Sequence, residues 1–240
     1  MESARVLLEK SMPDLQARHA HSSSSRAAHN AFARRASRAF VFLCFGIGAV
    51  AVAVPIVLRL TGGPDTSISQ YYWNDDARDL LVGMLCATGV FLVLFQGLSR
   101  WENVILSLAG VSVIVVALVP VDESGDLSRS IGHVAAAVLF FLCLFVVAVF
   151  FSRNRLGLVE DERLRRRLAM LYLFAGWSMI ALPIGALMIA GMDKAEGNVI
   201  FWIESAALYA FALYWFTKSF EYSKLIDGSV GEVLAACVME

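Results

Sequence analysis

Charge is scarce in this chain of 240 residues. Only 17% of the residues are Asp, Glu, Lys or Arg, whereas 58% are hydrophobic, and the mean hydropathy is +0.67. A soluble domain carries about 25% charged and about 45–50% apolar residues, so this composition argues against a water-soluble domain. The formal net charge of −1 argues against nucleic acid as a partner, because such partners require a basic face.

Sequence signatures of common chemistry are also missing. The chain has no GxxxxGK[ST], no GxGxxG that opens a helix after a strand, no GxSxG and no HExxH. Most nucleotide-dependent enzymes and standard hydrolases are therefore disfavoured. Three of the four cysteines, Cys44, Cys86 and Cys143, lie inside apolar runs, and no CxxC occurs. This arrangement argues against a disulfide framework or a structural zinc site.

The chain does have six long apolar runs. A bilayer core about 30 Å thick needs about 20 helical residues, and each run is close to this length. Continuous runs favour helices over strands, because lipid offers no partner for unpaired backbone groups. We therefore predict an all-α polytopic membrane protein that forms a six-transmembrane-helix bundle in the lipid bilayer. The runs cover residues 40–60, 80–98, 103–120, 131–151, 168–191 and 198–217.

Lys and Arg predict how the chain is threaded. Sixteen of the 20 lie on the side of the N-terminus if the six runs alternate in direction, and four lie on the other side. The positive-inside rule then predicts that both termini are cytoplasmic, in the cell membrane. Residues 1–39 are expected to form a flexible basic tail, residues 40–220 the transmembrane domain, and residues 221–240 a cytoplasmic C-terminal tail. Small residues at helical spacing, Gly83 with Ala87 and Ala181 with Gly185, are candidates for close helix packing.

The stretch SISQYYWNDDARD, residues 67–79, joins the first two runs on the predicted outer side. We expect an ordered cap over the bundle, with Tyr71, Tyr72 and Trp73 along the membrane interface and their polar atoms toward water. The alternative is an aromatic belt with exposed acids and no further role.

Ionisable groups within or beside the runs mark a candidate pocket. Asp79 begins the second run, His133 lies near the start of the fourth, and Glu204 lies about 9 Å into the sixth. An ionisable group at membrane depth is costly, and is therefore a candidate functional group. All three runs go inward from the outer side, so the three groups share one depth, which Arg59 also approaches. The candidate pocket residues are Asp79, His133, Glu204, Arg59, Ser69, Tyr71 and Asp76.

The three ionisable groups are compatible with three roles. An imidazole and two carboxylates would suit a divalent metal such as zinc, whose catalytic sites commonly use three protein ligands. They would equally suit a proton relay, and an Arg59–Glu204 ion pair would be purely structural.

Four features of the sequence occur in this order: SxSxYY, RDLLVG, an acidic turn after Pro120, and a His at the start of the fourth run. On these features, the sequence over residues 40–220 resembles a group of uncharacterised bacterial six-span integral membrane proteins. A weaker resemblance is to the alkaline ceramidase and adiponectin-receptor superfamily of membrane hydrolases, in which Ser, Asp and His surround zinc. That resemblance matches Ser69, Asp79 and His133. The superfamily also has seven core spans and a later HxxxH pair, and this chain has neither.

Three functions are therefore open from the sequence. The first is an outward-facing polar pocket that binds or transports a small ligand or protons. The second is a metal-dependent membrane hydrolase that acts on an amphiphile at the outer leaflet. The third is a structural or sensory membrane subunit.

Overall fold

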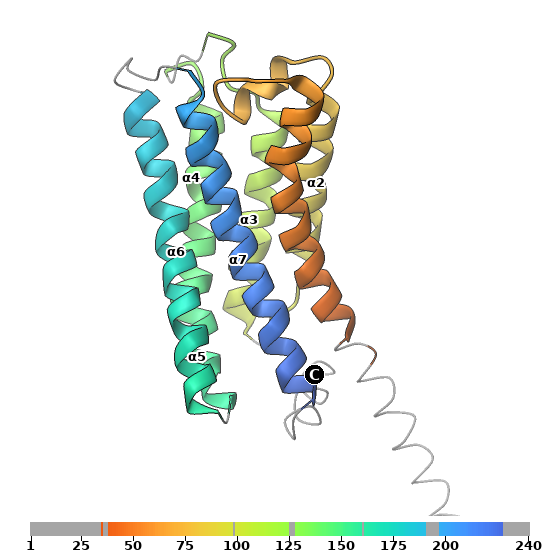
Figure 1. Cartoon of the computed structure of the whole chain (residues 1–240), viewed down its shortest axis with the longest axis vertical. Coiled ribbons are helices and arrows are strands. Elements are labelled where there is room, and N and C mark those ends of the chain that lie inside the picture. The colour runs from red at the N-terminus through yellow and green to blue at the C-terminus, as the bar shows by residue number, and fades with distance from the viewer. Residues whose placement is uncertain are drawn as a thin grey trace, which may run out of the picture.

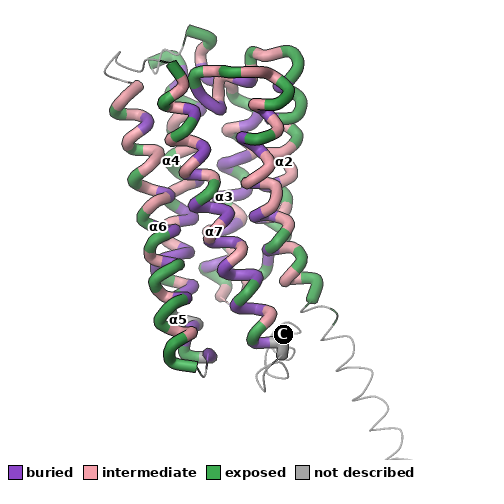
Figure 2. The backbone as a smooth tube through the Cα atoms, viewed as in Figure 1, coloured by how far each residue is buried: buried purple, intermediate pink, exposed green. Residues whose placement is uncertain are grey.

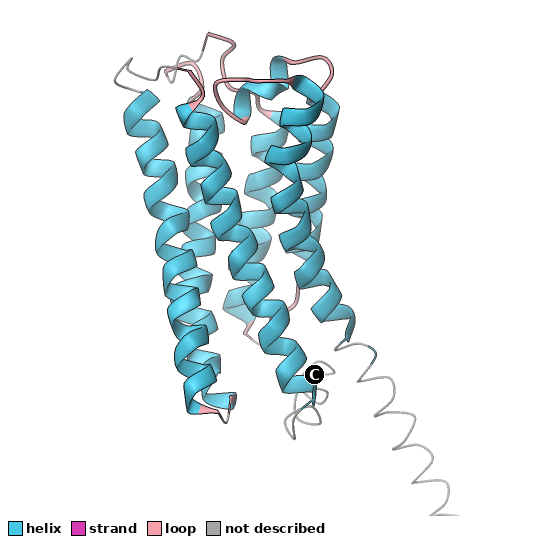
Figure 3. Ribbon diagram, viewed as in Figure 1, coloured by secondary structure: helices cyan, strands magenta, loops and turns pink. Residues whose placement is uncertain are grey.

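The structure is a computed structural model that describes residues 35, 38–97, 99–124, 128–159, 161–190 and 197–227. Most of the two predicted tails, 1–39 and 221–240, lies outside the described residues. Within the described part of the chain, all regular structure is helical, which confirms the predicted all-α class (Figure 3).

Six long helices account for most of the described chain. The first helix covers Arg38–Gly62, and a short 3-10 helix, η1, follows at Ser69–Trp73. The fourth long helix continues without a break into a π-helical turn and a further short helix. The remaining bounds are α2 Arg78–Leu94, α3 Arg100–Leu118, α4 Ile131–Val146, η2 Val147–Phe151, α5 Ser152–Arg155, η3 Leu156–Leu158, α6 Glu162–Ala190 and α7 Val199–Asp227.

Five of these helices are long and apolar enough to cross a membrane by length and composition: Arg38–Gly62, Arg100–Leu118, Ile131–Phe151, Glu162–Ala190 and Val199–Leu225. The sixth, α2, has 17 residues and lies at the short limit for a spanning helix. A multi-pass membrane protein is therefore the architecture that the helices support.

The helices run side by side along the long axis of the molecule (Figure 1). α2 packs along α3, α3 along α4, and α6 along α7. We call one end of the bundle the cap end; the helices reach it at Gly62, Arg78, Leu118, Ile131, Ala190 and Val199. The opposite end, which contains residues 95–97, 99–100, 152–159 and 161–162, is the basal end.

Apolar side chains cover both the inside and the outside of the bundle. The interior holds large side chains that are almost fully buried, such as Trp215, Phe95 and Phe211. Exposed residues alternate with buried ones along each helix (Figure 2), and many exposed side chains are large and apolar, among them Phe174 and Trp177. Lipid-facing surfaces have this composition, because hydrocarbon replaces water as the solvent.

Close packing occurs at glycines other than the expected ones. A Cβ added at Gly89 of α2 would lie 2.7 Å from the carbonyl oxygen of Gly110 in α3, so the two backbones are in contact there. Gly83 and Gly185 have no atom within 4 Å of an added Cβ. The predicted packing faces at these two positions are therefore wrong, because helical spacing of small residues does not say which face meets a neighbour.

Candidate functional site

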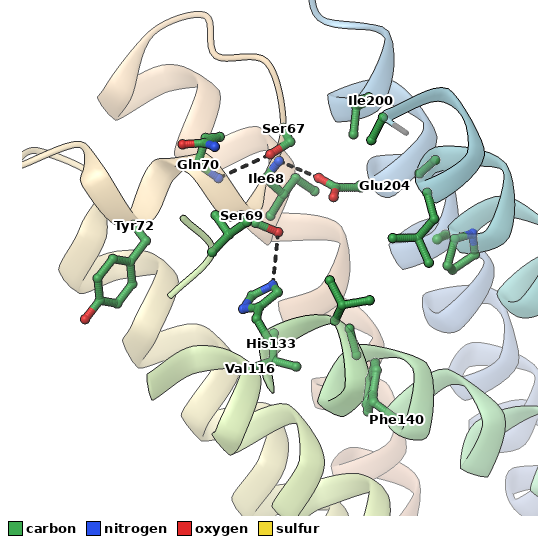
Figure 4. Close-up of a pocket in the computed structure, with 18 of the residues that line it drawn as sticks. Ser67, Ile68, Ser69, Gln70, Tyr72, Val116, His133, Phe140, Ile200 and Glu204 are labelled. Carbon is green, nitrogen blue, oxygen red and sulfur yellow. Dashed lines mark hydrogen bonds between the residues drawn. The ribbon is translucent and has the colours of Figure 1, made fainter. Parts of the chain in front are cut away.

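A cavity of about 250 Å³ lies inside the cap end of the bundle. Its walls come mainly from α4, α6 and α7, with two residues each from α2 and α3, and residues 66–70 with Tyr72 form its cover. Most of the lining is aliphatic or aromatic. Polar side chains gather at the cover: Thr66, Ser67, Ser69, Gln70, His133 and Glu204 (Figure 4).

The cover is an ordered segment, as predicted for residues 67–79. Its 3-10 helix η1 is fixed to α7 at one side, where the Ile68 N–H donates to Glu204. It is fixed to the segment after α3 at the other side, where the Trp73 indole N–H donates to the Val121 carbonyl at 2.9 Å. The Asn74 side-chain amide donates to the Gly62 carbonyl at 3.0 Å. The segment is therefore a cap on the bundle rather than a slack linker.

Tyr71 holds the cap from inside. Its side chain is fully buried against Phe201, and its hydroxyl donates to the Gly63 carbonyl at 2.5 Å. Gly63 has φ = 73°, a backbone conformation that glycine adopts without strain. The expectation that Tyr71 lies along the membrane interface is wrong, because its ring fills a gap between the first helix and α7.

His133 lies in the first turn of α4 and is buried. Its Nδ1 lies 2.7 Å from the Val119 carbonyl, and its Nε2 lies 3.3 Å from the Ser69 hydroxyl. A carbonyl oxygen only accepts, so Nδ1 carries the hydrogen of a neutral ring and Nε2 accepts from Ser69. His133 thereby connects α4 to the cap and to the end of α3.

Glu204 enters the cavity from α7. It is half-buried, and its Oε2 accepts the Ile68 N–H at 2.5 Å, so the carboxylate is oriented toward the cover (Figure 4). The first turn of α7 is also joined to the cap segment, because the Phe201 N–H donates to the Thr66 carbonyl at 2.9 Å. Glu204 therefore has a fixed orientation before any ligand is bound.

The structure brings three of the seven predicted pocket residues together. Ser69, His133 and Glu204 line the cavity. Tyr71 packs behind the cover, while Asp76 and Asp79 are exposed on the outside of the cap and at the start of α2. The described lining of the cavity includes none of these last three residues.

Arg59 has a different neighbour from the expected one. Its guanidinium lies 5.1 Å from the centre of the Phe201 ring, and Nη1 is buried without a hydrogen bond among the described residues. No Arg59–Glu204 ion pair occurs there, so the predicted pair is wrong; the partner of Glu204 is a backbone N–H. Sequence reasoning missed this contact because a backbone amide carries no sequence signal.

The suggested zinc ligands Asp79, His133 and Glu204 are not gathered at one point. Within the described residues, no group of three His, Cys, Asp or Glu side chains could hold a metal ion. The geometry at the cap end is that of an apolar chamber with an acceptor and several hydroxyls at one end.

A second polar cluster lies toward the basal end and was not expected. The Lys218 ammonium is 3.1 Å from Glu102 Oε1 and 3.2 Å from the Ser152 hydroxyl, and both ionic side chains are almost fully buried. Ser152 is also 3.1 Å from the Tyr214 hydroxyl. These contacts join α3, α5 and α7 through one network.

Gly97 and Tyr172 complete the surroundings of this cluster. A Cβ at Gly97 would lie 2.3 Å from Glu102 Oε2, so the loop between α2 and α3 packs directly on the carboxylate. The Tyr172 hydroxyl of α6 donates to Glu221 of α7. Glu102 and Lys218 each lie one residue outside a predicted apolar run, so neither was among the candidate site residues.

Comparisons with known proteins give no relatives for this site. The chain matches no family model, no curated protein and no solved structure.

Proposed function

We propose that the chain is a multi-pass membrane protein whose cap-end cavity binds a small amphiphile, with a hydrogen-bond-donating head group at Glu204 and an apolar body in the chamber below. The observation that supports this proposal is a single carboxylate, that of Glu204, held by a hydrogen bond at the covered end of a largely apolar cavity. Binding sites commonly combine an apolar lining with a few placed polar groups.

The chemistry of the lining decides the class of ligand. Phe140, Leu187 and Leu208 offer only apolar contact, so the body of the ligand has to be hydrocarbon. Glu204 accepts hydrogen bonds, and the Ser67 and Ser69 hydroxyls donate or accept. An amine or an alcohol therefore fits the head group, whereas a second carboxylate would face Glu204 at close range. The cavity volume of about 250 Å³ is smaller than that of pockets for drug-sized ligands, which is about 300–1,000 Å³, and this favours a small ligand.

Binding is favoured over passage through the bundle. On α3, α4 and α7, the cavity ends at Val113, Phe141 and Leu208. Toward the basal end on the same three helices lie Leu106, Leu144 and Phe211, which are all fully or almost fully buried. Apolar side chains therefore separate the cavity from the Glu102–Lys218 cluster.

The proposed placement follows from charge. Arg100, Arg153, Arg163 and Lys224 belong to the basal end, and Arg59, Arg78 and Arg129 to the cap end. We take α2 as a span in addition to the five longer helices, which gives six spans and leaves both termini on one side. By the positive-inside rule, that side is the cytoplasmic side of the cell membrane, and the cavity is nearer the outer face.

A thermal-shift experiment with three matched probes tests the binding function. Purified protein is mixed with cyclohexylmethylamine, cyclohexylmethanol or cyclohexanecarboxylate, which share one apolar body. The amine and the alcohol are expected to raise the unfolding temperature, and the acid is not, because only the first two donate to Glu204. A hydrogen bond to a charged group contributes about 1.5–3 kcal/mol, so Glu204→Gln should weaken amine binding by at least about tenfold.

Two variants serve as controls for this experiment. Asp79→Asn removes an exposed acid at the same end of the bundle and should leave amine binding unchanged. Ala137→Leu narrows the cavity and should weaken binding of both donor probes. Tighter binding of the acid than of the amine, or equal losses in Glu204→Gln and Asp79→Asn, would contradict the proposal.

A further inference from the structure

A second pocket lies at the basal end, between the end of α4 and the start of α6. Its volume is about 430 Å³. Arg153, Arg165 and Arg166 supply its polar lining, and Val149, Phe150 and Ala169 are among its apolar lining residues. The π-helical turn η2 and the short helices that follow bring Arg153 to face the first turn of α6.

The pocket has an excess of positive charge. Glu162 pairs with Arg166 at 3.1 Å and with Arg165 at 3.9 Å, while the described residues offer Arg153 no ion pair. Among the described residues, the three guanidiniums of the pocket thus have ion pairs with one carboxylate only, that of Glu162. The Glu162 and Arg166 side chains are 63% and 69% exposed, and an exposed pair of this kind is weak enough to exchange for another anion.

The pocket also lies where the apolar spans end. Arg153 follows the span Ile131–Phe151 by two residues, and Arg165 and Arg166 precede the buried Leu168. Phe150, which is 55% exposed, lies on the membrane side of Arg153 along the same helical stretch. The three arginines therefore lie at head-group level, with an apolar wall that continues toward the hydrocarbon.

From this geometry we propose that the basal pocket binds an anionic glycerophospholipid, with the phosphate between Arg153 and Arg165 and an acyl chain along Val149 and Phe150. Guanidinium groups bind phosphate oxygens in pairs, and basic pockets between membrane helices bind anionic head groups. The apolar wall selects a lipid over free phosphate, since free phosphate has nothing to place there. This site is separate from the cap-end cavity and does not depend on its function.

Native mass spectrometry of the full chain tests the proposal. Protein is loaded in neutral detergent with dioleoylphosphatidylglycerol or dioleoylphosphatidylcholine, and retained lipid is counted. The wild type should retain the anionic lipid preferentially. Arg153→Gln/Arg165→Gln should lower that retention by about fivefold for each arginine. Arg163→Gln/Arg167→Gln makes the same charge change at exposed positions outside the pocket, and should leave retention within about twofold.

A steric variant and a competitor complete the design. A Cβ at Gly157, which lines the pocket, would meet no atom within 4 Å, so Gly157→Leu adds bulk to the pocket without changing charge. This variant should also lower retention of the anionic lipid. Equal losses in the two arginine pairs, no effect of Gly157→Leu, or displacement of the lipid by millimolar inorganic phosphate would each overturn the proposal.

Discussion

Lys218 and Glu102 are the most deeply enclosed charges in the described chain. Their side chains are 0% and 1% exposed, and they come from helices that are far apart in the sequence. Two charges in a low-dielectric interior are costly to bury but attract each other strongly, so each depends on the other. Ser152 shares the ammonium and is itself bonded to Tyr214, which leaves the pair with fixed geometry.

Replacing Lys218 by methionine should therefore destabilise the bundle. Lys218→Met leaves Glu102 buried without its ammonium, and removal of one partner of a buried pair costs about 3–5 kcal/mol. The measurement is the free energy of unfolding in mixed micelles, followed by tryptophan fluorescence. Lys224→Met, at an exposed lysine of the same helix, should change it by less than about 0.5 kcal/mol.

A double variant separates the charge from the shape of the side chain. Glu102→Gln keeps the shape of the acid and removes its charge, so Glu102→Gln/Lys218→Met should recover most of the lost stability. If Lys218→Met were as stable as Lys224→Met, the pair would not hold the helices together.

Tyr71 anchors the cap to the bundle. Its hydroxyl bonds to Gly63, and its ring is buried between the first helix and α7. Tyr71→Phe should lower local stability by about 1 kcal/mol, the net value of one hydrogen bond, and raise amide exchange across residues 67–74 by about fivefold. Hydrogen exchange in nanodiscs measures this change.

Tyr72→Phe is the matched control. Among the described residues, the Tyr72 hydroxyl has one hydrogen bond, which it accepts from the exposed Arg78 side chain at 3.3 Å, so exchange in the cap should stay as in the wild type. Immediate exchange of residues 67–76 in the wild-type protein would show that the cap is not ordered.

The backbones of α2 and α3 are in close contact at Gly89 and Gly110, and substitution of these glycines tests the contact. A Cβ at Gly110 would lie 2.5 Å from the Gly89 carbonyl oxygen, closer than carbon and oxygen can approach. Because the obstacle is backbone, the two helices would have to separate along their shared face.

Gly110→Ala should therefore lower the free energy of unfolding by about 1–3 kcal/mol, as overpacking does in well-packed cores. Gly83→Ala, in an open position of α2, should be neutral or stabilising by up to about 1 kcal/mol, because alanine is the better helix former. Denaturant titration of both variants distinguishes packing from helix propensity. If Gly110→Ala and Gly83→Ala were equally stable, α2 and α3 would not be in close backbone contact at Gly110.

The whole molecule is polarised in charge along its axis. Most described arginines belong to the basal end, within or at the ends of its helices. Because translocation of Lys and Arg is disfavoured, the basal end is expected to face the cytoplasm.

Cysteine labelling of intact cells tests this orientation. A membrane-impermeant maleimide should modify Asp75→Cys at the cap end but not Arg163→Cys at the basal end, in a background without the native thiol at position 237. Both positions are exposed in the folded protein. The same reagent should reach positions 126 and 194, which lie outside the described residues, and should not reach position 155. Labelling at 163 without permeabilisation would reverse the topology.

The sequence alone determined the helical architecture. Each apolar run is a local property of the sequence. In hydrocarbon or a packed interior the backbone has to satisfy its own hydrogen bonds, so the six runs predict six helices whatever the neighbouring helices are. The sequence also selected His133 and Glu204, since depth along a span can be counted from its start. It selected Ser69 as part of the polar stretch that joins the first two runs.

Only the tertiary structure decided which of those groups meet. Ile68 and Glu204 are 136 residues apart and Glu102 and Lys218 are 116 apart, and no local pattern reports such contacts. The bundle turned Asp79 outward, buried Tyr71 and gave Arg59 an aromatic neighbour. It also drew Lys218 inside, because a charge that finds its counter-ion need not end a buried helix.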